Sequence, residues 1–139
     1  MAKEETFAMI KPYAFRNNHV GPILAIINKA GFRIRCLKST KLTKDQAEEF
    51  YEVHKSKDFY ENLVSFMSSG PIIAIILEKE NAIEDFRKLI GKTNPNEAKE
   101  GTIRKLFAES VQKNAIHGSD SPENAKKECD FFFSYKERY

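Results

Sequence analysis

The chain has 139 residues, of which 41% are hydrophobic and 31% charged, and its formal net charge is +3. This length allows one domain with a real core, and the composition excludes a disordered chain or a membrane protein. The longest apolar run, residues 72–77, is far shorter than the ~18–20 residues that cross a bilayer. The small positive excess argues against a protein that binds nucleic acid through overall charge, although it leaves room for a local basic patch.

The N-terminal residues contain no apolar segment of the kind that directs export. The two cysteines, Cys36 and Cys129, lie far apart in the sequence and form no metal-ligand pair. We therefore expect a cytoplasmic protein in which both thiols are reduced and buried as small hydrophobic side chains.

The first part of the chain predicts two strands that flank a helix. Residues 6–10 are typical of a short strand, and Pro12 marks its end because proline cannot donate to a sheet. A helix begins at Gly21, and its apolar residues repeat at the spacing of one buried helical face. Apolar residues 32, 34 and 36 then alternate with two arginines, which predicts a half-exposed strand.

Two helices and a buried strand are predicted next. Thr43 and Gln46 form a capping-box pattern, which starts the first helix. A second helix starts near Asp58 and ends at Gly70. Residues 72–77 are apolar without alternation and rich in β-branched side chains, which predicts a central strand covered on both faces.

The last part of the chain predicts three further helices and a strand. One helical pattern begins at Asn81, and a polar loop follows it over residues 92–101, long enough to suggest a function. Thr102 caps a short helix, and Ser121 begins the last one. The three phenylalanines at 131–133 predict a final strand.

This order of elements predicts an α+β fold with an antiparallel four-stranded sheet. Without the helix pair at 43–69, the order is β-α-β-β-α-β, the ferredoxin-like arrangement, with helices on the faces of the sheet. The helix pair is then a helical hairpin insertion, and a long loop precedes the candidate active-site histidine. We expect a single domain over residues 1–139.

Neither of the common nucleotide-binding loops is present. Residues 91–93 resemble the end of a phosphate loop, but Phe86 stands where the pattern requires glycine, and the segment follows a helix. The sequence contains no Gly-x-Gly-x-x-Gly, and its three histidines lack the spacing of a zinc site. A nucleotide site in this chain would therefore use other groups.

The densest polar segment is residues 114–121, in which His117 lies among small and hydroxyl side chains just before a helix. A neutral imidazole can accept a phosphoryl group on one nitrogen if a fixed acceptor holds the other, and Glu128 is a candidate acceptor. Considered alone, His117 is explained at least as well as a loop histidine with local hydrogen bonds.

Three cations, Lys11, Arg87 and Arg104, stand near the ends of predicted elements. Both residue types suit phosphate, arginine through bidentate donors and lysine as a point charge. Taken singly, each is also explained as a solvated surface charge.

Residues 114–121 resemble the active-site signature of the nucleoside diphosphate kinases. The blocks at 6–12, 66–71, 91–95 and 101–104 resemble other blocks of this family in the same order and with fitting spacing. The resemblance therefore covers essentially the whole chain.

The resemblance implies a kinase that moves the γ-phosphate of a nucleoside triphosphate, typically ATP, to a nucleoside diphosphate by a ping-pong route, and so maintains NTP and dNTP pools. His117 matches the phosphorylated nucleophile, Glu128 the carboxylate that orients it, and Ser119 the hydroxyl beside it. Phe59 and Val111 match the pair that sandwiches the base, with Leu63 alongside. The residues that match phosphate and sugar contacts are Lys11, Tyr51, Arg87, Thr93, Arg104 and Asn114.

The resemblance also implies cofactors and partners. Mg²⁺ is expected to arrive with the nucleotide phosphates, because the chain offers no dedicated metal site of carboxylates. Members of the family form tetramers or hexamers built from dimers, so we expect a homo-oligomer. No membrane or specific nucleic acid is expected as a partner.

Four positions, in three places along the chain, depart from the family pattern. Tyr13 replaces the usual acidic residue, so the loop at 13–19 is expected to be anchored differently. Lys57 and Asp58 replace an Arg-Pro pair before the base-stacking phenylalanine, which affects the helix pair that grips the nucleotide. Glu100 replaces a proline that many members have, which is expected to loosen the long loop.

Two other function classes remain open at this point. Ferredoxin-like sheets with exposed aromatic residues bind RNA, but the aromatic signature of such modules is absent here. An inactive family member could act as an assembly or interaction protein, although the intact His117, Lys11 and Arg104 argue against it.

Overall fold

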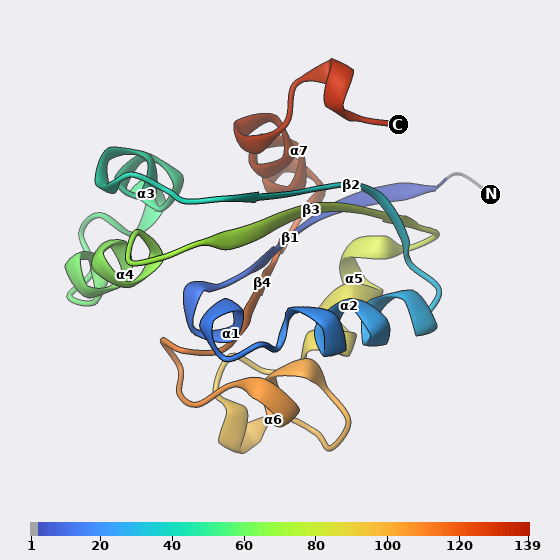
Figure 1. Cartoon of the computed structure of the whole chain (residues 1–139), viewed down its shortest axis with the longest axis horizontal. Helices are drawn as coiled ribbons and strands as arrows, with labels where there is room; N and C mark the ends of the chain where they lie inside the picture. Colours follow the sequence, from blue (N-terminus) through green and yellow to red (C-terminus); the bar gives the residue numbers. More distant parts are fainter. Residues whose placement is uncertain (1–2) are drawn as a thin grey trace.

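The computed structural model describes residues 3–139 (Figure 1). Its strands are β1 (Glu4–Ile10), β2 (Arg33–Thr40), β3 (Ile72–Lys79) and β4 (Ile116–Gly118). Its α-helices are α1 (Pro12–Arg16), α2 (Val20–Lys29), α3 (Lys44–Phe50), α4 (Tyr60–Met67), α5 (Ala82–Ile90), α6 (Ile103–Phe107) and α7 (Pro122–Phe132). Short 3₁₀ helices are η1 (Glu52–His54), η2 (Pro95–Glu97) and η3 (Tyr135–Glu137).

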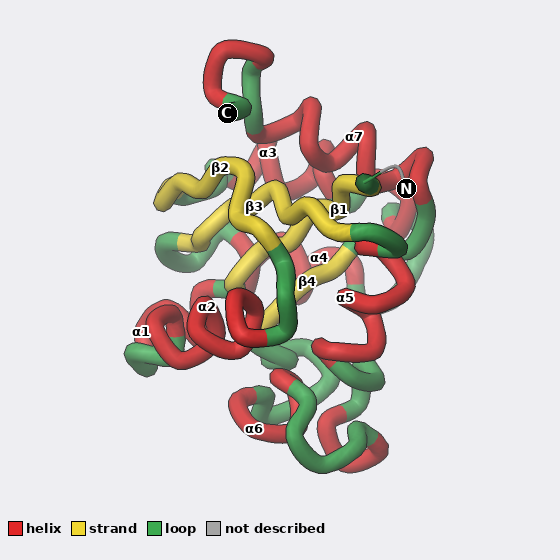
Figure 2. The backbone as a smooth tube through the Cα atoms, turned by 90° about the vertical axis from the view of Figure 1, so that its right-hand side faces the viewer, coloured by secondary structure: helices red, strands yellow, loops and turns green. Residues whose placement is uncertain are grey.

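The strands form one four-stranded sheet in the order β2-β3-β1-β4, and every neighbouring pair is antiparallel. Figure 2 shows this sheet in yellow, with helices on both of its sides. The predicted α+β class and the ferredoxin-like four-stranded sheet are therefore confirmed. The pair α3 and α4 is inserted between β2 and β3, as the hairpin prediction required, and the Tyr60 hydroxyl joins the two helices by donating to the Glu48 carbonyl at 3.0 Å.

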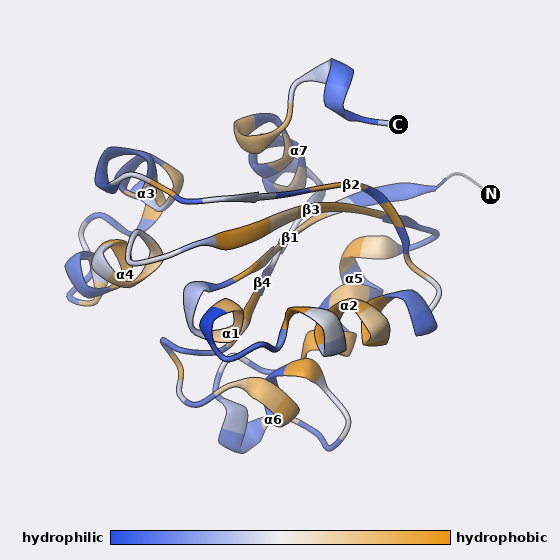
Figure 3. Ribbon diagram, in the orientation of Figure 1, coloured by the Kyte–Doolittle hydropathy of each residue, from blue (hydrophilic) through white to orange (hydrophobic). Residues whose placement is uncertain are grey.

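The side chains of β3 alternate between two buried clusters, one on each face of the sheet. Ile72, Ala74 and Ile76 face the cluster that α3, α4 and α7 cover. The residues between them face the cluster that α1, α2, α5 and α6 cover. Figure 3 shows the apolar stretch of β3 at the centre of the sheet, between these two layers of helices. The central strand was thus predicted correctly, and the covered faces leave little sheet surface on which an RNA-binding module could stack bases.

The alternation predicted for β2 is interrupted by a bulge. Ile34 pairs with Leu77 and packs on one cluster, whereas Cys36 pairs with Ile76 and belongs to the other. One extra residue in a strand turns every later side chain to the opposite face. The expectation that residues 32, 34 and 36 share one face is therefore wrong, because Arg35 lies in the bulge.

The predicted final strand is also wrong. Phe131 and Phe132 end helix α7, and the fourth strand is β4, which comes before that helix and contains His117. Phe132 is buried and its ring stacks on Phe7 with centroids 5.1 Å apart, while Phe131 is only partly buried. The apolar run at 131–133 reflects the buried end of a helix.

Several predicted caps are present. The Thr43 hydroxyl accepts from the Gln46 backbone while the Gln46 side chain accepts from the Thr43 backbone, which completes the capping box. Thr102 and Ser121 cap α6 and α7 through their hydroxyls. The predicted start at Asp58 is displaced, because α4 begins after Phe59 and has no side-chain cap.

Both cysteines are free and buried in the cluster beneath α7, as predicted. Burial is the main cause that raises the pKa of the Cys129 thiol to about 12. A thiol with so high a pKa is a poor nucleophile at neutral pH. No helix within residues 3–139 is long and apolar enough to cross a membrane.

The pairing of β1 with β4 brings distant parts of the chain together. Met9 lies opposite His117 in the ladder, and the Lys11 backbone N–H donates to the Ala115 carbonyl at 2.9 Å. Gly118 lies opposite Ala8, and a Cβ atom there would come within 2.9 Å of the Phe86 ring and 3.1 Å of Ile90. The absence of a side chain at Gly118 thus lets α5 pack closely beneath His117.

We predict that Gly118→Ala lowers the free energy of unfolding by about 1–3 kcal/mol, because the added methyl overpacks a filled core. Gly21→Ala is the matched control, since a Cβ atom added at Gly21 would meet no atom of a non-neighbouring residue within 4 Å. In helix α2 this control should gain roughly 0.5–1 kcal/mol. Urea unfolding of both variants measures the difference, and a loss of equal size in both would contradict the packing argument.

Candidate active site

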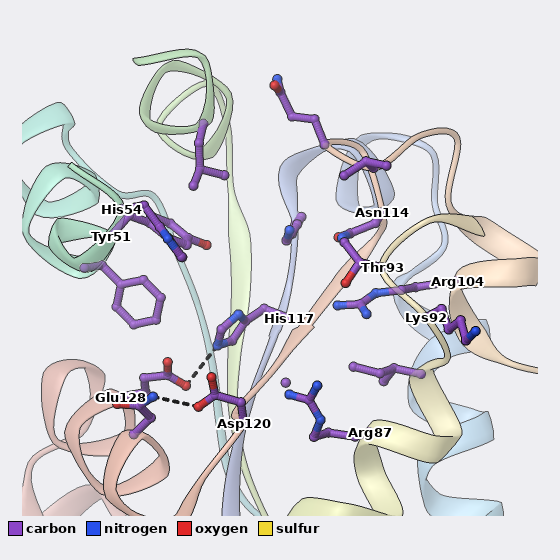
Figure 4. Close-up of a pocket in the computed structure, with 18 of the residues that line it drawn as sticks. Tyr51, His54, Arg87, Lys92, Thr93, Arg104, Asn114, His117, Asp120 and Glu128 are labelled. Carbon is purple, nitrogen blue, oxygen red and sulfur yellow. Dashed lines mark hydrogen bonds and ion pairs between the residues drawn. The ribbon is translucent and has the colours of Figure 1, made fainter. Parts of the chain in front are cut away.

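A cleft of about 1500 Å³ opens beside β4 and is larger than the roughly 300–1000 Å³ of typical small-molecule pockets (Figure 4). Residues of α5, α7, the helix pair and the loops around α6 contribute to its walls. It contains every residue that the sequence predicted for the site except Ser119, namely Lys11, Tyr51, Phe59, Leu63, Arg87, Thr93, Arg104, Val111, Asn114, His117 and Glu128.

Ser119 lies behind the cleft wall, where it supports the His117–Glu128 pair. The Nε2 atom of His117 is 2.9 Å from the Glu128 Oε1 atom, and the Ser119 hydroxyl donates to the same oxygen at 2.6 Å. The Phe7 backbone N–H in turn donates to the Ser119 hydroxyl at 3.3 Å. Because a carboxylate only accepts, the neutral imidazole carries its proton on Nε2 and keeps the lone pair on Nδ1.

Aromatic rings hold the imidazole from the side. The Phe50 ring lies edge-on to His117 with centroids 5.7 Å apart, and the Phe7 ring is tilted at 6.0 Å. Phe50 ends helix α3 and was not among the residues expected in the site, because nothing in the sequence indicates that this helix reaches the imidazole. The rings and the carboxylate together restrict how the imidazole can turn.

Three cations converge on the cleft, and none of them has an acidic partner within 4 Å among residues 3–139. The Arg104 guanidinium donates to the carbonyls of Gly91 at 2.9 Å and Ile116 at 3.0 Å, which fixes its direction. Burial and the charge of Arg87 lower the pKa of Arg104 to about 10. Burial and the charge of Arg104 lower the pKa of Lys11 to about 7. This concentration of positive charge is complementary to a polyanion.

Several buried polar atoms of the cleft have no hydrogen-bond partner among the described residues. They are the Tyr51 hydroxyl, the Asn114 Oδ1 atom and the Arg104 Nε atom. Burial raises the pKa of Tyr51, so its hydroxyl stays a neutral donor. Buried polar groups are rarely left unpaired in proteins, so these atoms indicate a polar ligand.

The opposite side of the cleft exposes apolar side chains. Phe59 is 47% exposed and Val111 54% exposed, although both line the cleft. His54 stacks on Tyr51 at 6.5 Å and lies tilted against Phe59 at 5.5 Å. His54 was not among the residues expected in the site, yet it lies in η1 and lines the cleft. Burial is the main cause that lowers its pKa, which favours a neutral ring.

A family model described as nucleoside diphosphate kinase matches residues 4–138. The chain belongs to the nucleoside diphosphate kinase family. It is 55% identical to the nucleoside diphosphate kinase of Flavobacterium psychrophilum over the whole length of both chains. It is 56% identical to that of Chloroherpeton thalassium over 96% of this chain and 95% of the relative.

Solved structures of nucleoside diphosphate kinases have the same fold. The Aquifex aeolicus enzyme superimposes with a TM-score of 0.96 at 43% identity, covering 99% of this chain and 100% of the other. A Halobacterium salinarum enzyme in complex with CDP gives a TM-score of 0.95 at 32% identity, covering 99% of this chain and 92% of the other. The resemblance inferred from the sequence motifs is thus confirmed at the level of the family.

Two departures from the nucleoside diphosphate kinase pattern lie near the cleft. The Lys57 ammonium is 6.0 Å from the centre of the Phe59 ring and helps to lower the pKa of His54. Glu100 is exposed in a turn where the Thr102 hydroxyl and backbone N–H both donate to the Lys99 carbonyl. The effects expected from these departures stay predictions.

Residues 3–139 contain no group of three or more His, Cys, Asp and Glu side chains that could hold a metal ion. The carboxylates nearest to His117 in the cleft already have partners. Glu128 accepts from Ser119, and Asp120 accepts from the Asn124 amide at 2.6 Å.

We predict that Lys11→Met makes the ligand-free protein more stable at neutral pH, because methionine fills the site without a buried charge. Lysine has a pKa of 10.5 in the unfolded chain and about 7 here, so the unfolded chain binds more protons between these values. The wild type therefore gains stability as the pH rises through this window. The advantage of the variant should shrink from about pH 7 to about pH 9, as urea unfolding at several pH values would measure. If the difference in the free energy of unfolding between the variant and the wild type stayed constant with pH, it would contradict the lowered pKa of Lys11.

Proposed function

We propose that this chain catalyses ping-pong transfer of the γ-phosphate of a nucleoside triphosphate, typically ATP, to a nucleoside diphosphate, with phosphohistidine at His117 as the intermediate. In cells this reaction would maintain NTP and dNTP pools. The observation that supports the proposal best is that the His117–Glu128 pair shares a cleft with three cations that lack acidic partners. Membership of the nucleoside diphosphate kinase family supports the same activity.

In the first half-reaction the Nδ1 lone pair of His117 attacks the γ-phosphorus. The N–P bond forms while the bond from phosphorus to the β-γ bridging oxygen breaks, and the nucleoside diphosphate leaves with that electron pair. Glu128 keeps its hydrogen bond to the Nε2 proton and stabilises the positive charge that develops on the ring. In the second half-reaction a terminal β-phosphate oxygen of another diphosphate attacks the phosphohistidine, and the N–P bond breaks.

The cations act on charge that spreads over the transferred group. Phosphoryl transfer depends mainly on positioning and on stabilisation of the equatorial oxygens. We assign this role to Lys11, Arg87 and Arg104, with the two carbonyl contacts of Arg104 holding its guanidinium in advance. Phosphate binding would favour the charged form of Lys11 again, because an adjacent anion raises a lysine pKa. We assign neutral contacts to the phosphates and sugar to the side chains of Tyr51, Thr93 and Asn114.

The base is proposed to lie between Phe59 and Val111, with Leu63 alongside. Stacking of this kind does not depend on which base is present, because every base has a π-face. The Halobacterium salinarum relative was solved with CDP, a pyrimidine nucleotide. We therefore propose that purine and pyrimidine nucleotides are both substrates.

We propose that Mg²⁺ enters the cleft on the phosphates, so that the magnesium–nucleotide complex is the substrate. Magnesium keeps several waters and binds through substrate phosphates in many phosphoryl-transfer sites. Residues 3–139 contain no cluster of three or more His, Cys, Asp and Glu side chains that could hold a metal ion without the nucleotide.

Three further expectations stay proposals. Residues 1–139 form a single catalytic domain, the protein is cytoplasmic, and the chain assembles into a tetramer or hexamer built from dimers. Light scattering on the purified protein would distinguish the two assemblies.

Incubation with γ-labelled ATP and Mg²⁺ should give a phosphoprotein that is labile in acid and stable in base, and that passes its label to added diphosphates. His117→Ala should abolish labelling, whereas His19→Ala, outside the cleft, should keep it. Glu128→Gln should slow labelling about ten- to hundredfold, the typical effect of removing a group that orients a reacting one. Label retained in His117→Ala would refute the role of His117 as the nucleophile. A wild type that is labelled but does not pass its phosphate to diphosphates would refute the proposed kinase activity.

We also predict that Phe59→Ala raises the KM for ADP, GDP and CDP by similar factors, on the order of tenfold, because one stacking contact is lost. Tyr135→Ala is the control, since Tyr135 is 91% exposed and lies away from the cleft. Steady-state kinetics with the three acceptors would measure the change. A strong effect on one base alone would indicate base-edge recognition instead of stacking.

A further inference from the structure

Aromatic rings from three separate elements meet around the imidazole of His117. The Phe50 ring of α3 lies 5.7 Å from the imidazole at an interplanar angle of 72°, and the Phe7 ring of β1 lies 6.0 Å away. Phe131 and Phe132 of α7 lie edge-on to Phe50, with centroids 5.3 and 5.4 Å from its own. We call Phe7, Phe50, Phe131 and Phe132 the aromatic cluster. These distances all lie in the range over which aromatic rings attract one another.

The hydrogen bond between His117 and Glu128 does not hold the imidazole completely (Figure 4). It fixes the position of one ring atom, Nε2, but the plane of the ring can still swing about that contact. The last torsion of a histidine side chain has a broad energy minimum, so the side chain's own geometry does not set this angle either. Neighbouring side chains must therefore decide where Nδ1 points.

Phe50 limits the swing of the imidazole on the side of the cleft. Phe7, the other phenylalanine in contact with His117, is fully buried and does not line the cleft. Phe50 is only partly buried and does line the cleft. With Phe7 on the core side, the imidazole can swing toward the cleft only if the Phe50 ring moves.

Helix α7 supplies both the carboxylate that holds the imidazole and the support for Phe50. Glu128, Phe131 and Phe132 are spaced i, i+3 and i+4, so their side chains share one face of that helix. The Phe50 ring packs on both of these phenylalanines. Phe50 and Glu128 are therefore fixed relative to each other, and His117 is in contact with both.

We propose that Phe50 is a positioning residue that holds the imidazole of His117 with Nδ1 directed at the γ-phosphorus, and so sets the rate of phosphoryl transfer but not the affinity for nucleotide. The proposal rests on the proposed function, in which Nδ1 is the nucleophile. Bound reactants react fast only when the reacting atoms are aligned, and a misplacement of about 1 Å can slow a reaction on the order of a hundredfold. Removal of the Phe50 ring leaves the three cations of the cleft and the proposed base site in place.

The first test compares Phe50→Leu with Phe133→Leu. Phe133 is buried in the same core cluster but does not line the cleft, so its variant measures the general effect of losing a core ring. At saturating Mg²⁺–ATP, Phe50→Leu should label His117 about tenfold more slowly than the wild type, whereas Phe133→Leu should stay within about twofold of it. The Kd for ADP, measured by calorimetry, should stay close to the wild-type value in both variants.

Phe50→Tyr keeps an aromatic ring at this position and should label His117 at a rate within about threefold of the wild type. An unchanged labelling rate in Phe50→Leu, or an equal fall in Phe133→Leu, would overturn the proposal. So would a Phe50→Tyr variant that is labelled as slowly as Phe50→Leu, or a Kd for ADP that rises as much as the labelling rate falls. Urea unfolding of each variant checks that it is folded under the conditions of the assay.

The second test does not depend on catalysis. Carbon-13 relaxation of the Cδ2–H bond of His117 gives an order parameter that reports how far the imidazole swings. The chain has three histidines, and the signal that is missing from His117→Ala identifies the one to follow. This order parameter should fall in Phe50→Leu and keep its wild-type value in Phe133→Leu.

An order parameter that is equal in Phe50→Leu and the wild type would overturn the positioning role. If the wild type transferred no phosphate, the proposed function would fail, and this measurement would still decide whether Phe50 holds the imidazole.

Discussion

The site depends on a short antiparallel pairing between β1 and β4. Three residue pairs, from Ala8 opposite Gly118 to Ile10 opposite Ile116, place His117 beside the end of the interior strand β1. Lys11 follows that strand directly, so the nucleophile and a buried cation share one rigid support. The same pairing brings Phe7 to Ser119, and Ser119 to the carboxylate that holds the imidazole. A slip of one residue in this pairing would turn His117 to the other face of the sheet.

The concentration of positive charge in the cleft destabilises the protein by itself and becomes favourable when an anionic ligand binds. Lys11 is buried and Arg104 is partly buried, each beside like charge, which lowers the pKa of both. Polar atoms of Tyr51 and Asn114 have no partner among the described residues. Binding sites commonly carry such locally destabilising features, because groups arranged for a ligand cannot satisfy one another. Stability from the two covered faces of the sheet allows the fold to tolerate them.

Much of the site could be predicted from the sequence because a contiguous signature and ordered blocks resemble one family. The residues that the prediction missed come from elsewhere in the chain. Phe50 packs on the imidazole, and His54 stacks on Tyr51 and lies tilted against Phe59. Each of them shows in the sequence only the spacing of an inward helix face. Periodicity states that a side chain is inside but does not state what it meets there.

The sequence by itself determined the helices with strong caps, the doubly buried strand β3 and the residues of the histidine signature. Tertiary structure decided which segment became the fourth strand. The three residues of β4 are too short to show an alternating pattern, and they form a strand only because β1 is available to pair with them. Phe131 and Phe132 resemble a strand locally, yet they end a helix that buries part of its length on β1. Local patterns record periodicity and turn chemistry, whereas contacts between residues about a hundred positions apart leave no local trace.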